Sequence, residues 1–472
     1  MSRIRERVSS KSLACVNRLC EDLSMVRKRQ AVVLIHGIGE QRPMDTLRSF
    51  VSGLGFKTYH SRPDRLSDSL ELRRYTIPGT TRRPVTDCYE LYWSHHFGRG
   101  KLLPTLGWAV RLLCRPRLWY HQGSLRNTIF AVLACGLVTA VFLGWLASLA
   151  MGRLTSTDIA GFVWVSIALL VLLVTAIFCS FITGRVAQAA RYLVPHPANL
   201  PGRNAIRADG LKLLRRLHED DRYERIILVG HSLGSVIGLD LLRLAWDELR
   251  QANPPKEFAQ PEAEAMDRLI AQQPTMSGDL DIAAFQQAQY RLWKENRHVG
   301  VEWRISDFVT LGSPLTHASL LLDTRKVKLQ QRMEEGEYPC CPPLPDPETI
   351  FLNKLCTSTN GEQRSVKVGM THAPFGPTRW TNLYFPVRFA LLGDPVGGPV
   401  ASEFGPGVRD VPVRPSVSEA RSRRYQMLMK SHSKYWVVEP GYPSSDRAVR
   451  KAQDQKTRTK DAHTMLLDAL AL

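Results

Sequence analysis

The chain lacks most features that mark metal-bound, disulfide-rich or nucleic-acid-binding proteins. Its nine cysteines in 472 residues show no metal-ligand spacing, since Cys340 and Cys341 are adjacent and Cys356 has no histidine or cysteine nearby. This usage is typical of a reducing compartment and predicts neither a disulfide framework nor a zinc site. No internal repeat or nucleic-acid-binding motif is visible. No apolar segment of signal-peptide length precedes the first expected strand, so a secretory signal is not expected.

Acidic residues are also scarce relative to basic ones. The sequence holds 63 Lys and Arg against 44 Asp and Glu, which gives a formal net charge of +19. Strong positive charge favours anionic partners. Because no nucleic-acid motif is present, we expect anionic lipid headgroups as the partner and no nucleic acid. Each basic residue near such a surface contributes on the order of 1 kcal/mol.

Charged residues are missing altogether from two long stretches, 128–152 and 159–184. Each is long enough for a helix that crosses about 30 Å of hydrocarbon. Buried core helices are the alternative, but core helices of this length normally carry a polar face. The short link predicts a two-helix transmembrane hairpin over 128–184. Basic residues on both outer flanks place the flanks in the cytoplasm, so the protein is expected to be integral to a membrane (the inner or plasma membrane in a bacterium), with its catalytic domain cytoplasmic. These flanking residues are Arg111, Arg115, Arg117, Arg126, Arg185 and Arg191.

The most informative motif is in residues 226–234, which read IILVGHSLG, an apolar run followed by G-x-S-x-G. This pattern predicts a strand that turns sharply into a helix and presents Ser232 as a nucleophile. The serine then has strained backbone, so its neighbours must be small. Gly230 and Gly234 meet this need, and His231 stands beside the serine. A chance match is the alternative, but the strand-like run before the motif and the helix-like run after it favour the nucleophile.

A second strand-like run ends in glycines at residues 31–39, AVVLIHGIG. Acyl transfer turns the substrate carbonyl oxygen into an oxyanion, which preorganised N–H donors stabilise. One donor should be the backbone N–H of Leu233, directly after the nucleophile. The other should come from Ile38 or Gly37 in the loop after the early strand. A tight turn without chemistry would explain the glycines but not their pairing with a downstream G-x-S-x-G motif.

Residues 36–41 (HGIGEQ) and 230–235 (GHSLGS) together resemble the serine hydrolases of the α/β-hydrolase superfamily, in the lipase and esterase branch. The resemblance covers the two ends and the middle of the chain but not the apolar section at 128–184. It implies an α/β-hydrolase fold, which is a mostly parallel sheet flanked by helices, here with the transmembrane hairpin inserted. It also implies a triad of serine, acid and histidine in that chain order.

The general base must then follow Ser232. Five histidines do so, and we favour His432 because it lies late in the chain. Its segment SHSKYW is similar to the late H-x-x-Y-W segment of related lipase-like sequences. His463 stands in a charged tail and is expected to be solvated, and His317 comes early for the usual order. The remaining candidates are His298 and His372.

The acid that orients the histidine is expected at Asp394. The resemblance places it in an Asp-Pro-Val loop after a strand, and here the strand-like residues 381–385 precede Asp394. An extra Phe-Ala-Leu-Leu stretch separates the strand from Asp394 and departs from the family pattern. An ordinary Asp-Pro turn is therefore the alternative reading. The other acids considered are Asp240, Asp307 and Asp410.

These features predict one hydrolase domain with insertions. Residues 87–93 should form a strand, 205–217 an amphipathic helix, and 397–424 a loop that leads to His432. The segments are a basic N-terminal part at 1–29, hydrolase core at 30–98, 200–250 and 301–440, a basic interfacial segment at 99–127, the hairpin at 128–184, a cap or lid at 251–300, and a charged C-terminal tail at 441–472. The tail is expected to end in an apolar-spaced helix around 465–472.

Two functions fit this organisation. The first is a membrane-anchored serine hydrolase that cleaves an ester through an acyl-enzyme intermediate, with a lipid or acyl ester favoured by the anchor. The second is a non-catalytic membrane scaffold that keeps the fold without turnover. The irregular placement of Asp394 favours the scaffold, whereas Ser232 and His432 favour the enzyme. A peptidase or acyltransferase with the same triad is also compatible. No cofactor or metal is predicted.

Overall fold

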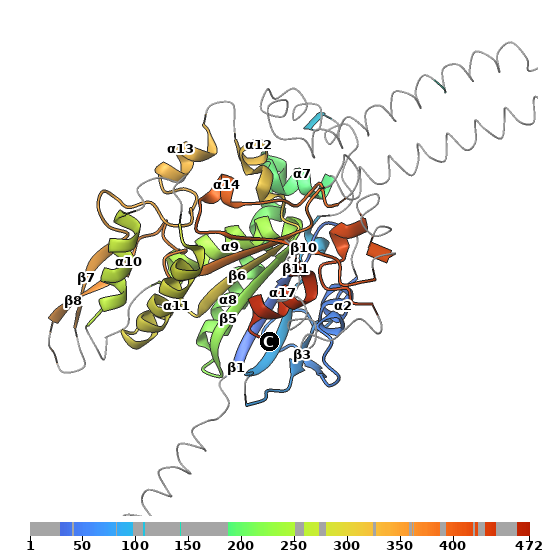
Figure 1. Cartoon of the computed structure of the whole chain (residues 1–472), viewed down its shortest axis with the longest axis horizontal. Helices are drawn as coiled ribbons and strands as arrows, with labels where there is room; N and C mark the ends of the chain where they lie inside the picture. The colour runs from blue at the N-terminus through green and yellow to red at the C-terminus, as the bar shows by residue number, and fades with distance from the viewer. Residues whose placement is uncertain are drawn as a thin grey trace, which may run out of the picture.

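The computed structural model describes an α/β protein built on one large sheet (Figure 1). The described residues are 29–39, 42–81, 83–97, 107–108, 142, 187–250, 259–272, 280–323, 327–357, 361, 363–387, 393–418, 421–422, 430–439 and 460–472.

Nine strands form this sheet within the described residues. It is parallel from β11 to β4, whereas β3 and β2 run antiparallel at one edge. A separate antiparallel hairpin consists of β7 (Phe351–Thr357) and β8 (Gln363–Gly369). The spatial order in the large sheet is β11 (Lys460–Asp461), β10 (Arg409–Arg414), β9 (Arg379–Tyr384), β6 (Ile305–Leu311), β5 (Tyr223–His231), β1 (Arg29–Ile35), β4 (Val85–Leu91), β3 (Arg73–Ile77) and β2 (His60–Pro63).

Helices pack on both faces of the sheet. One face carries α8 (Leu200–Glu219), α9 (Leu233–Leu249) and α11 (Ile282–His298), with α10 (Pro261–Ala271) packed on α11. The other face carries α2 (Asp45–Gly53) and α17 (Ala462–Leu470). The shorter elements are α7 (Ala187–Leu193), α12 (Ala318–Leu322), α13 (Leu329–Glu334), α14 (Ala401–Phe404), η1 (Ser94–His96), η3 (Pro197–Asn199), η4 (Pro314–His317) and η5 (Lys430–Ser433).

Strand β1 shows why the central strands are apolar throughout. Val33 and Ile35 belong to the core on the α8–α9 side, whereas Val32 and Leu34 belong to the core on the α2–α17 side. Successive side chains of a strand point to opposite faces, so a parallel strand covered by helices on both sides needs apolar residues at every position. Each such side chain contributes roughly 1.5–3 kcal/mol on burial. The continuous apolar runs of the sequence follow from this two-sided cover.

The strands expected before both glycine motifs are confirmed as β1 and β5. The strand expected at 87–93 corresponds to β4, and the amphipathic helix expected at 205–217 lies within α8. The expectation of a loop at 397–424 is wrong, because β10 and α14 form there. The helix expected at the end of the charged C-terminal tail is confirmed as α17, whereas the short strand β11 before it was not expected. The apolar face of α17 packs into the core, and the Gln30 side chain donates to the Leu470 carbonyl oxygen at 3.2 Å.

The predicted transmembrane hairpin at 128–184 lies outside the described residues apart from Phe142, and the interfacial segment at 99–127 lies outside them apart from residues 107 and 108. Of the basic segment at 1–29, only Arg29 is described, and it begins β1. Among the described residues, we find no helix with the length and apolarity needed to cross a membrane.

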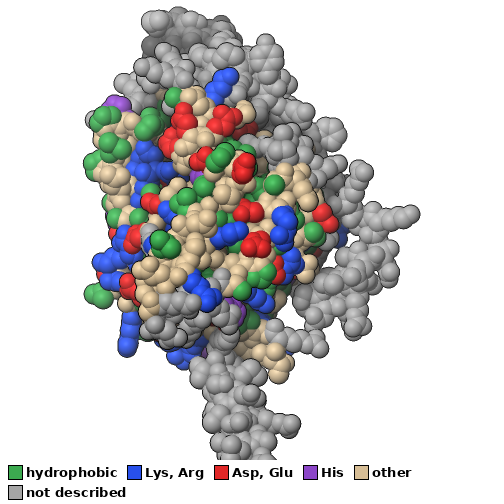
Figure 2. Space-filling model, turned by 90° about the vertical axis from the view of Figure 1, so that its left-hand side faces the viewer, with side chains coloured by type: hydrophobic (Ala, Val, Ile, Leu, Met, Phe, Trp, Pro, Cys, Tyr) green, Lys and Arg blue, Asp and Glu red, His purple; other side chains and the backbone are tan. Residues whose placement is uncertain are grey.

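The segment expected as a cap, 251–300, contains α10 and α11. The side chain of Gln289 on α11 donates to the carbonyl oxygens of Phe375 and Thr378, so this helix is fastened to the chain that leads into β9. Figure 2 shows the side of the molecule that carries α10, α11 and the β7–β8 hairpin, where basic and acidic side chains are interspersed. Arg291 pairs there with Glu262 at 2.9 Å. A role of this segment as a cap over the site stays a prediction.

A buried carboxyl group on β4 predicts a pH-dependent stability. Burial raises the pKa of Glu90 to about 7, although the Met44 N–H donates to its carboxylate at 2.9 Å. The folded state therefore favours the protonated acid, so stability falls as pH rises from about 4.5 to about 7, by roughly 3 kcal/mol. We expect Glu90→Gln to abolish this fall when unfolding by denaturant is followed from pH 4.5 to 8. The exposed control Glu71→Gln should keep the wild-type profile, and a Glu90→Gln profile parallel to wild type would contradict the assignment.

Candidate active site

Ser232 lies at the junction of β5 and α9 in strained backbone. Its φ is 53° and its ψ is −128°, and its N–H donates to the Leu311 carbonyl oxygen at 3.0 Å. A positive φ is costly for a residue with a Cβ atom, and such strain clusters at functional sites. Helix α9 begins directly after this residue, at Leu233. The strand, the strained serine and the helix are the context that the G-x-S-x-G motif predicts.

Three glycines let backbone segments approach the serine more closely than any other residue would allow. A Cβ atom on Gly230 would lie 2.5 Å from the Cα of Ser235, and one on Gly234 would lie 2.1 Å from the Ile35 carbonyl oxygen. A Cβ atom on Gly37 would lie 2.8 Å from the Cβ of Ser232. The turn after β1 is therefore packed against the nucleophile candidate, as the two glycine motifs predicted.

The strain at Ser232 predicts a stability gain when it is relieved. Both Ser232→Ala and Ser232→Gly remove the hydroxyl group, but only glycine removes the Cβ atom. We expect Ser232→Gly to be more stable than Ser232→Ala by about 1–2 kcal/mol in denaturant unfolding. The matched pair Ser52→Ala and Ser52→Gly, at an exposed position of α2, should show the opposite order, because glycine weakens a helix. Equal stability of the two Ser232 variants would contradict strain at this residue.

The loop after β1 is held from outside the turn. The Trp93 indole N–H donates to the His36 carbonyl oxygen at 2.9 Å, and the Gly39 N–H donates to the Gln188 side chain at 2.9 Å. Burial lowers the pKa of His36 to about 4, so its ring is neutral at physiological pH. Ile38 packs partly buried against the core. These contacts fix the segment whose N–H groups are the expected oxyanion donors.

His432 and Asp394 form a hydrogen-bonded pair. The Nδ1 atom of His432 donates to Oδ2 of Asp394 at 2.9 Å. The Tyr435 hydroxyl donates to the same oxygen at 2.8 Å, and the Val396 N–H donates to Oδ1 at 3.0 Å. Burial would raise the pKa of Asp394, but His432, Tyr435 and the Gly397 N–H together hold it below its usual value. The carboxylate is therefore ionised, and it leaves Nε2 of His432 free to accept a proton.

His231 connects the serine turn to the histidine segment. Its Nε2 atom donates to the His432 carbonyl oxygen at 2.7 Å, and the two imidazole rings lie 5.0 Å apart. Burial lowers the pKa of His231 to about 3, so the ring is a neutral donor at physiological pH. Ser431 adds a second tie by donating to the Gly393 carbonyl oxygen at 2.7 Å. The residue next to Ser232 thus fixes the backbone of His432.

Sequence reasoning missed two residues of this arrangement. Gly312, at the end of β6, has a φ of 56°, and a Cβ atom there would lie 2.8 Å from Oδ2 of Asp394 and 3.1 Å from Nδ1 of His432. The Leu-Gly-Ser turn after a strand was its only signal. Tyr435 was visible in the H-x-x-Y-W segment, but its hydroxyl was not expected to bind the acid. Both residues shape the space that the histidine–acid pair occupies.

The other acids considered have partners elsewhere. Asp307 pairs with Arg225 at 2.5 Å at the start of β6, which is the opposite end of that strand from Gly312. Asp240 pairs with Arg207 at 2.6 Å. Asp410 accepts hydrogen bonds from the backbone N–H groups at the start of α14. The structure brings only Asp394, of the four acids considered, to His432.

The other histidines contact backbone oxygens or the core. His317 lies 3.3 Å from the Pro395 carbonyl oxygen, beside the acid loop. His298 and His372 pair with backbone carbonyl oxygens, at 2.7 and 2.9 Å. The expectation that His463 is solvated is wrong, because α17 packs against the sheet and buries it.

Comparison with known proteins adds no relative. No family model, curated protein or solved structure matches this chain. The interpretation of the site therefore depends on its own geometry.

Proposed function

We propose that this chain is a serine hydrolase of the α/β-hydrolase type that cleaves an ester through Ser232, His432 and Asp394. The observation that carries the proposal is that a strained serine and a histidine–carboxylate pair both lie at the carboxyl ends of neighbouring parallel strands, with His231, next to Ser232, hydrogen-bonded to the His432 backbone. The order β9, β6, β5, β1 supports it, because the acid loop, Gly312, the serine and the Gly37 turn follow these four strands in turn. Ligands of open parallel sheets bind at this edge.

In the proposed reaction, the Ser232 hydroxyl oxygen attacks the ester carbonyl carbon while His432 Nε2 takes the hydroxyl proton. The N–H groups of Leu233 and of Gly37 or Ile38 stabilise the oxyanion. Collapse of the tetrahedral intermediate breaks the ester C–O bond, and His432 returns the proton to the departing alcohol. Water, activated by His432, then releases the acid from Ser232. Asp394 keeps His432 in the tautomer that accepts at Nε2 and stabilises its cationic form.

The proposed setting is a membrane, with a lipid or acyl ester as substrate. It depends on the two charge-free stretches at 128–152 and 159–184 and on their basic flanks. A hairpin there would hold the catalytic domain on the cytoplasmic side, next to anionic headgroups. An enzyme fixed at a bilayer reaches acyl esters in that bilayer without releasing them into water.

Labelling with a fluorophosphonate, which reacts with activated serines, tests the proposal. Full-length protein in detergent should be labelled, and the modified peptide should contain Ser232. Ser232→Ala and His432→Ala should lose the label, because the first lacks the nucleophile and the second its base. Ser52→Ala, on the exposed part of α2, should label like wild type. Folded wild-type protein that takes up no label would instead favour the non-catalytic scaffold.

A further inference from the structure

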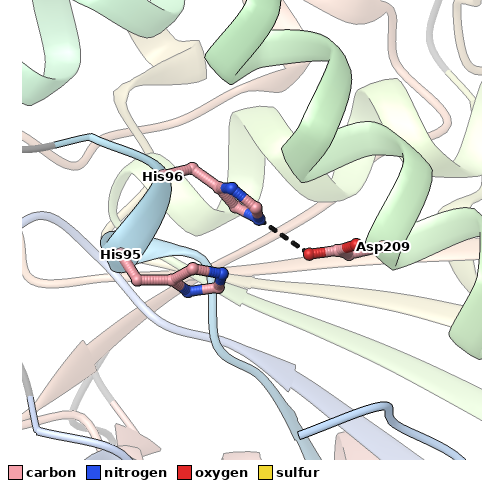
Figure 3. Close-up of side chains that lie close together, drawn as sticks. All are labelled: His95, His96 and Asp209. Carbon is pink, nitrogen blue, oxygen red and sulfur yellow. Dashed lines mark hydrogen bonds and ion pairs between the residues drawn. The ribbon is translucent and has the colours of Figure 1, made fainter.

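Two histidines and one aspartate that do not belong to the Ser232–His432–Asp394 arrangement form a cluster of their own. His95 and His96 are neighbours in η1, just after β4, and Asp209 lies on α8. Both imidazole rings and the carboxylate turn toward one another (Figure 3). The Nε2 atom of His96 lies 2.7 Å from Oδ2 of Asp209, and the two ring centroids lie 3.9 Å apart. One ligand atom from each residue lies within 4.8 Å of the other two.

We propose that His95, His96 and Asp209 bind a divalent transition metal of the zinc class. Imidazole nitrogen and carboxylate oxygen bind Zn²⁺ at about 2.0–2.2 Å, and three protein ligands leave a fourth tetrahedral position for water. Ligand atoms at such distances lie roughly 3.4 Å from one another. The ligand atoms of the cluster lie within 4.8 Å of one another, so metal binding would draw them together by up to about 1.4 Å. Two imidazoles disfavour Ca²⁺ and Mg²⁺, which prefer oxygen ligands throughout.

The surroundings of the cluster favour binding because they already hold the ligands in place. The Tyr92 ring stacks on His95 at 5.4 Å and 14°. A Cβ atom on Gly202 of α8 would lie 2.5 Å from the Phe97 ring, so η1 and α8 are in close contact. Little backbone ordering remains for a metal to impose, which improves affinity.

The cysteine spacing of the sequence predicted no zinc site, and this cluster contains no cysteine. The ordinary alternative is a hydrogen bond between His96 and Asp209 that joins η1 to α8. That alternative gives His95 no role, whereas metal binding requires it. Substitution of His95 therefore distinguishes the two explanations. The proposal is independent of ester hydrolysis, since it concerns residues outside the Ser232 site.

Direct metal binding provides the test. Full-length protein with a histidine-free affinity tag would be stripped with a chelator in detergent and titrated with Zn²⁺ against a chromophoric chelator. Co²⁺ would be added in parallel, because its visible absorption reports nitrogen and oxygen ligands. We expect wild type to bind one Zn²⁺ ion tightly per chain. His95→Ala, His96→Ala and Asp209→Asn should each weaken this binding by at least about 100-fold, which is the upper end of the loss on removing groups that only orient ligands.

The controls are His60→Ala and His298→Ala, which remove exposed histidines elsewhere and should bind like wild type. Zn²⁺ should also raise the thermal midpoint of wild type, followed by tryptophan fluorescence, but not that of the three cluster variants. Metal-free thermal midpoints show whether each variant is folded. The proposal would be overturned if wild type bound no Zn²⁺ tightly. It would also be overturned if folded His95→Ala bound Zn²⁺ as tightly as wild type.

Discussion

Ser232→Ala is expected to lower kcat for a p-nitrophenyl ester by roughly 10⁶-fold, as removal of the nucleophile does in serine hydrolases. The remaining activity would come from binding and from the oxyanion donors, which alanine leaves in place. The substitution keeps the Cβ atom and thus the strained backbone, with φ at 53°. Its folded structure should therefore match wild type, and the loss should be confined to catalysis. Steady-state hydrolysis in detergent measures the effect.

The control for this prediction is Ser52→Ala, which should hydrolyse the ester at the wild-type rate. Active-site titration would exclude a contaminating esterase, because the released product burst must equal the amount of protein. Retention of a tenth or more of the activity in Ser232→Ala would place the nucleophile elsewhere. Wild type without hydrolysis of short-chain or lipid esters would favour the scaffold.

The serine turn was predictable because its signal is local. The apolar run, the two small neighbours and the following helix lie within one stretch of sequence, and each has a steric reason. A Cβ atom on Gly234 would lie 2.1 Å from the Ile35 carbonyl oxygen, so the close packing of β1 also requires glycine at this position of the motif. Adjacent parallel strands then bring their carboxyl ends together. This is why the position of Gly37 beside Ser232 followed from two separate motifs.

Asp394 shows what local patterns do not contain. The residues between β9 and Asp394 departed from the family pattern, but the Asp394 N–H lies 3.4 Å from the Phe385 carbonyl oxygen. A Cβ atom on Gly393, where φ is 112°, would lie 2.5 Å from the Pro386 carbonyl oxygen. Asp394 thus lies beside the end of β9 despite its longer separation in the sequence. The position of Asp394 depends on backbone contacts that cannot be read from the spacing of residues in the sequence.

The C-terminal helix was predicted from its apolar spacing, but its burial was not. The charged residues before it suggested a solvated segment around His463, but Leu466 and Leu470 are fully buried against the sheet. The same packing buries His463, whose sequence neighbours gave no sign of it. Long-range cover of a sheet face depends on which surface remains open after the rest of the chain has folded. The local charge pattern therefore gave the wrong exposure for His463, because packing with distant parts of the chain determines that exposure.

Asp394→Asn is the second large expected effect and the sharpest test of the pair. Asparagine has nearly the same size, but its side-chain NH₂ or oxygen would face Nδ1 of His432 without negative charge. The histidine would lose the preference for the tautomer that accepts at Nε2, and its cation would lose a stabilising carboxylate. We expect kcat/KM to fall by about 10⁴-fold, with little change in KM. Ester hydrolysis at saturating substrate measures kcat, and hydrolysis at low substrate concentration measures kcat/KM.

Tyr435→Phe is the matched control, because it removes a donor to the same carboxylate oxygen at 2.8 Å and leaves the charge in place. Its loss should be up to about 100-fold, well short of that of Asp394→Asn, since a hydrogen bond to a charged group contributes about 1.5–3 kcal/mol. Asp410→Asn should leave hydrolysis at the wild-type rate where it folds, because Asp410 binds the start of α14 and not His432. If Asp394→Asn were as active as wild type and Asp410→Asn inactive but folded, the acid assignment would be reversed. Both Asp394→Asn and Tyr435→Phe alter the hydrogen bonds of the same carboxylate group, but only the first removes its negative charge, so the difference between the two losses reports mainly the charge.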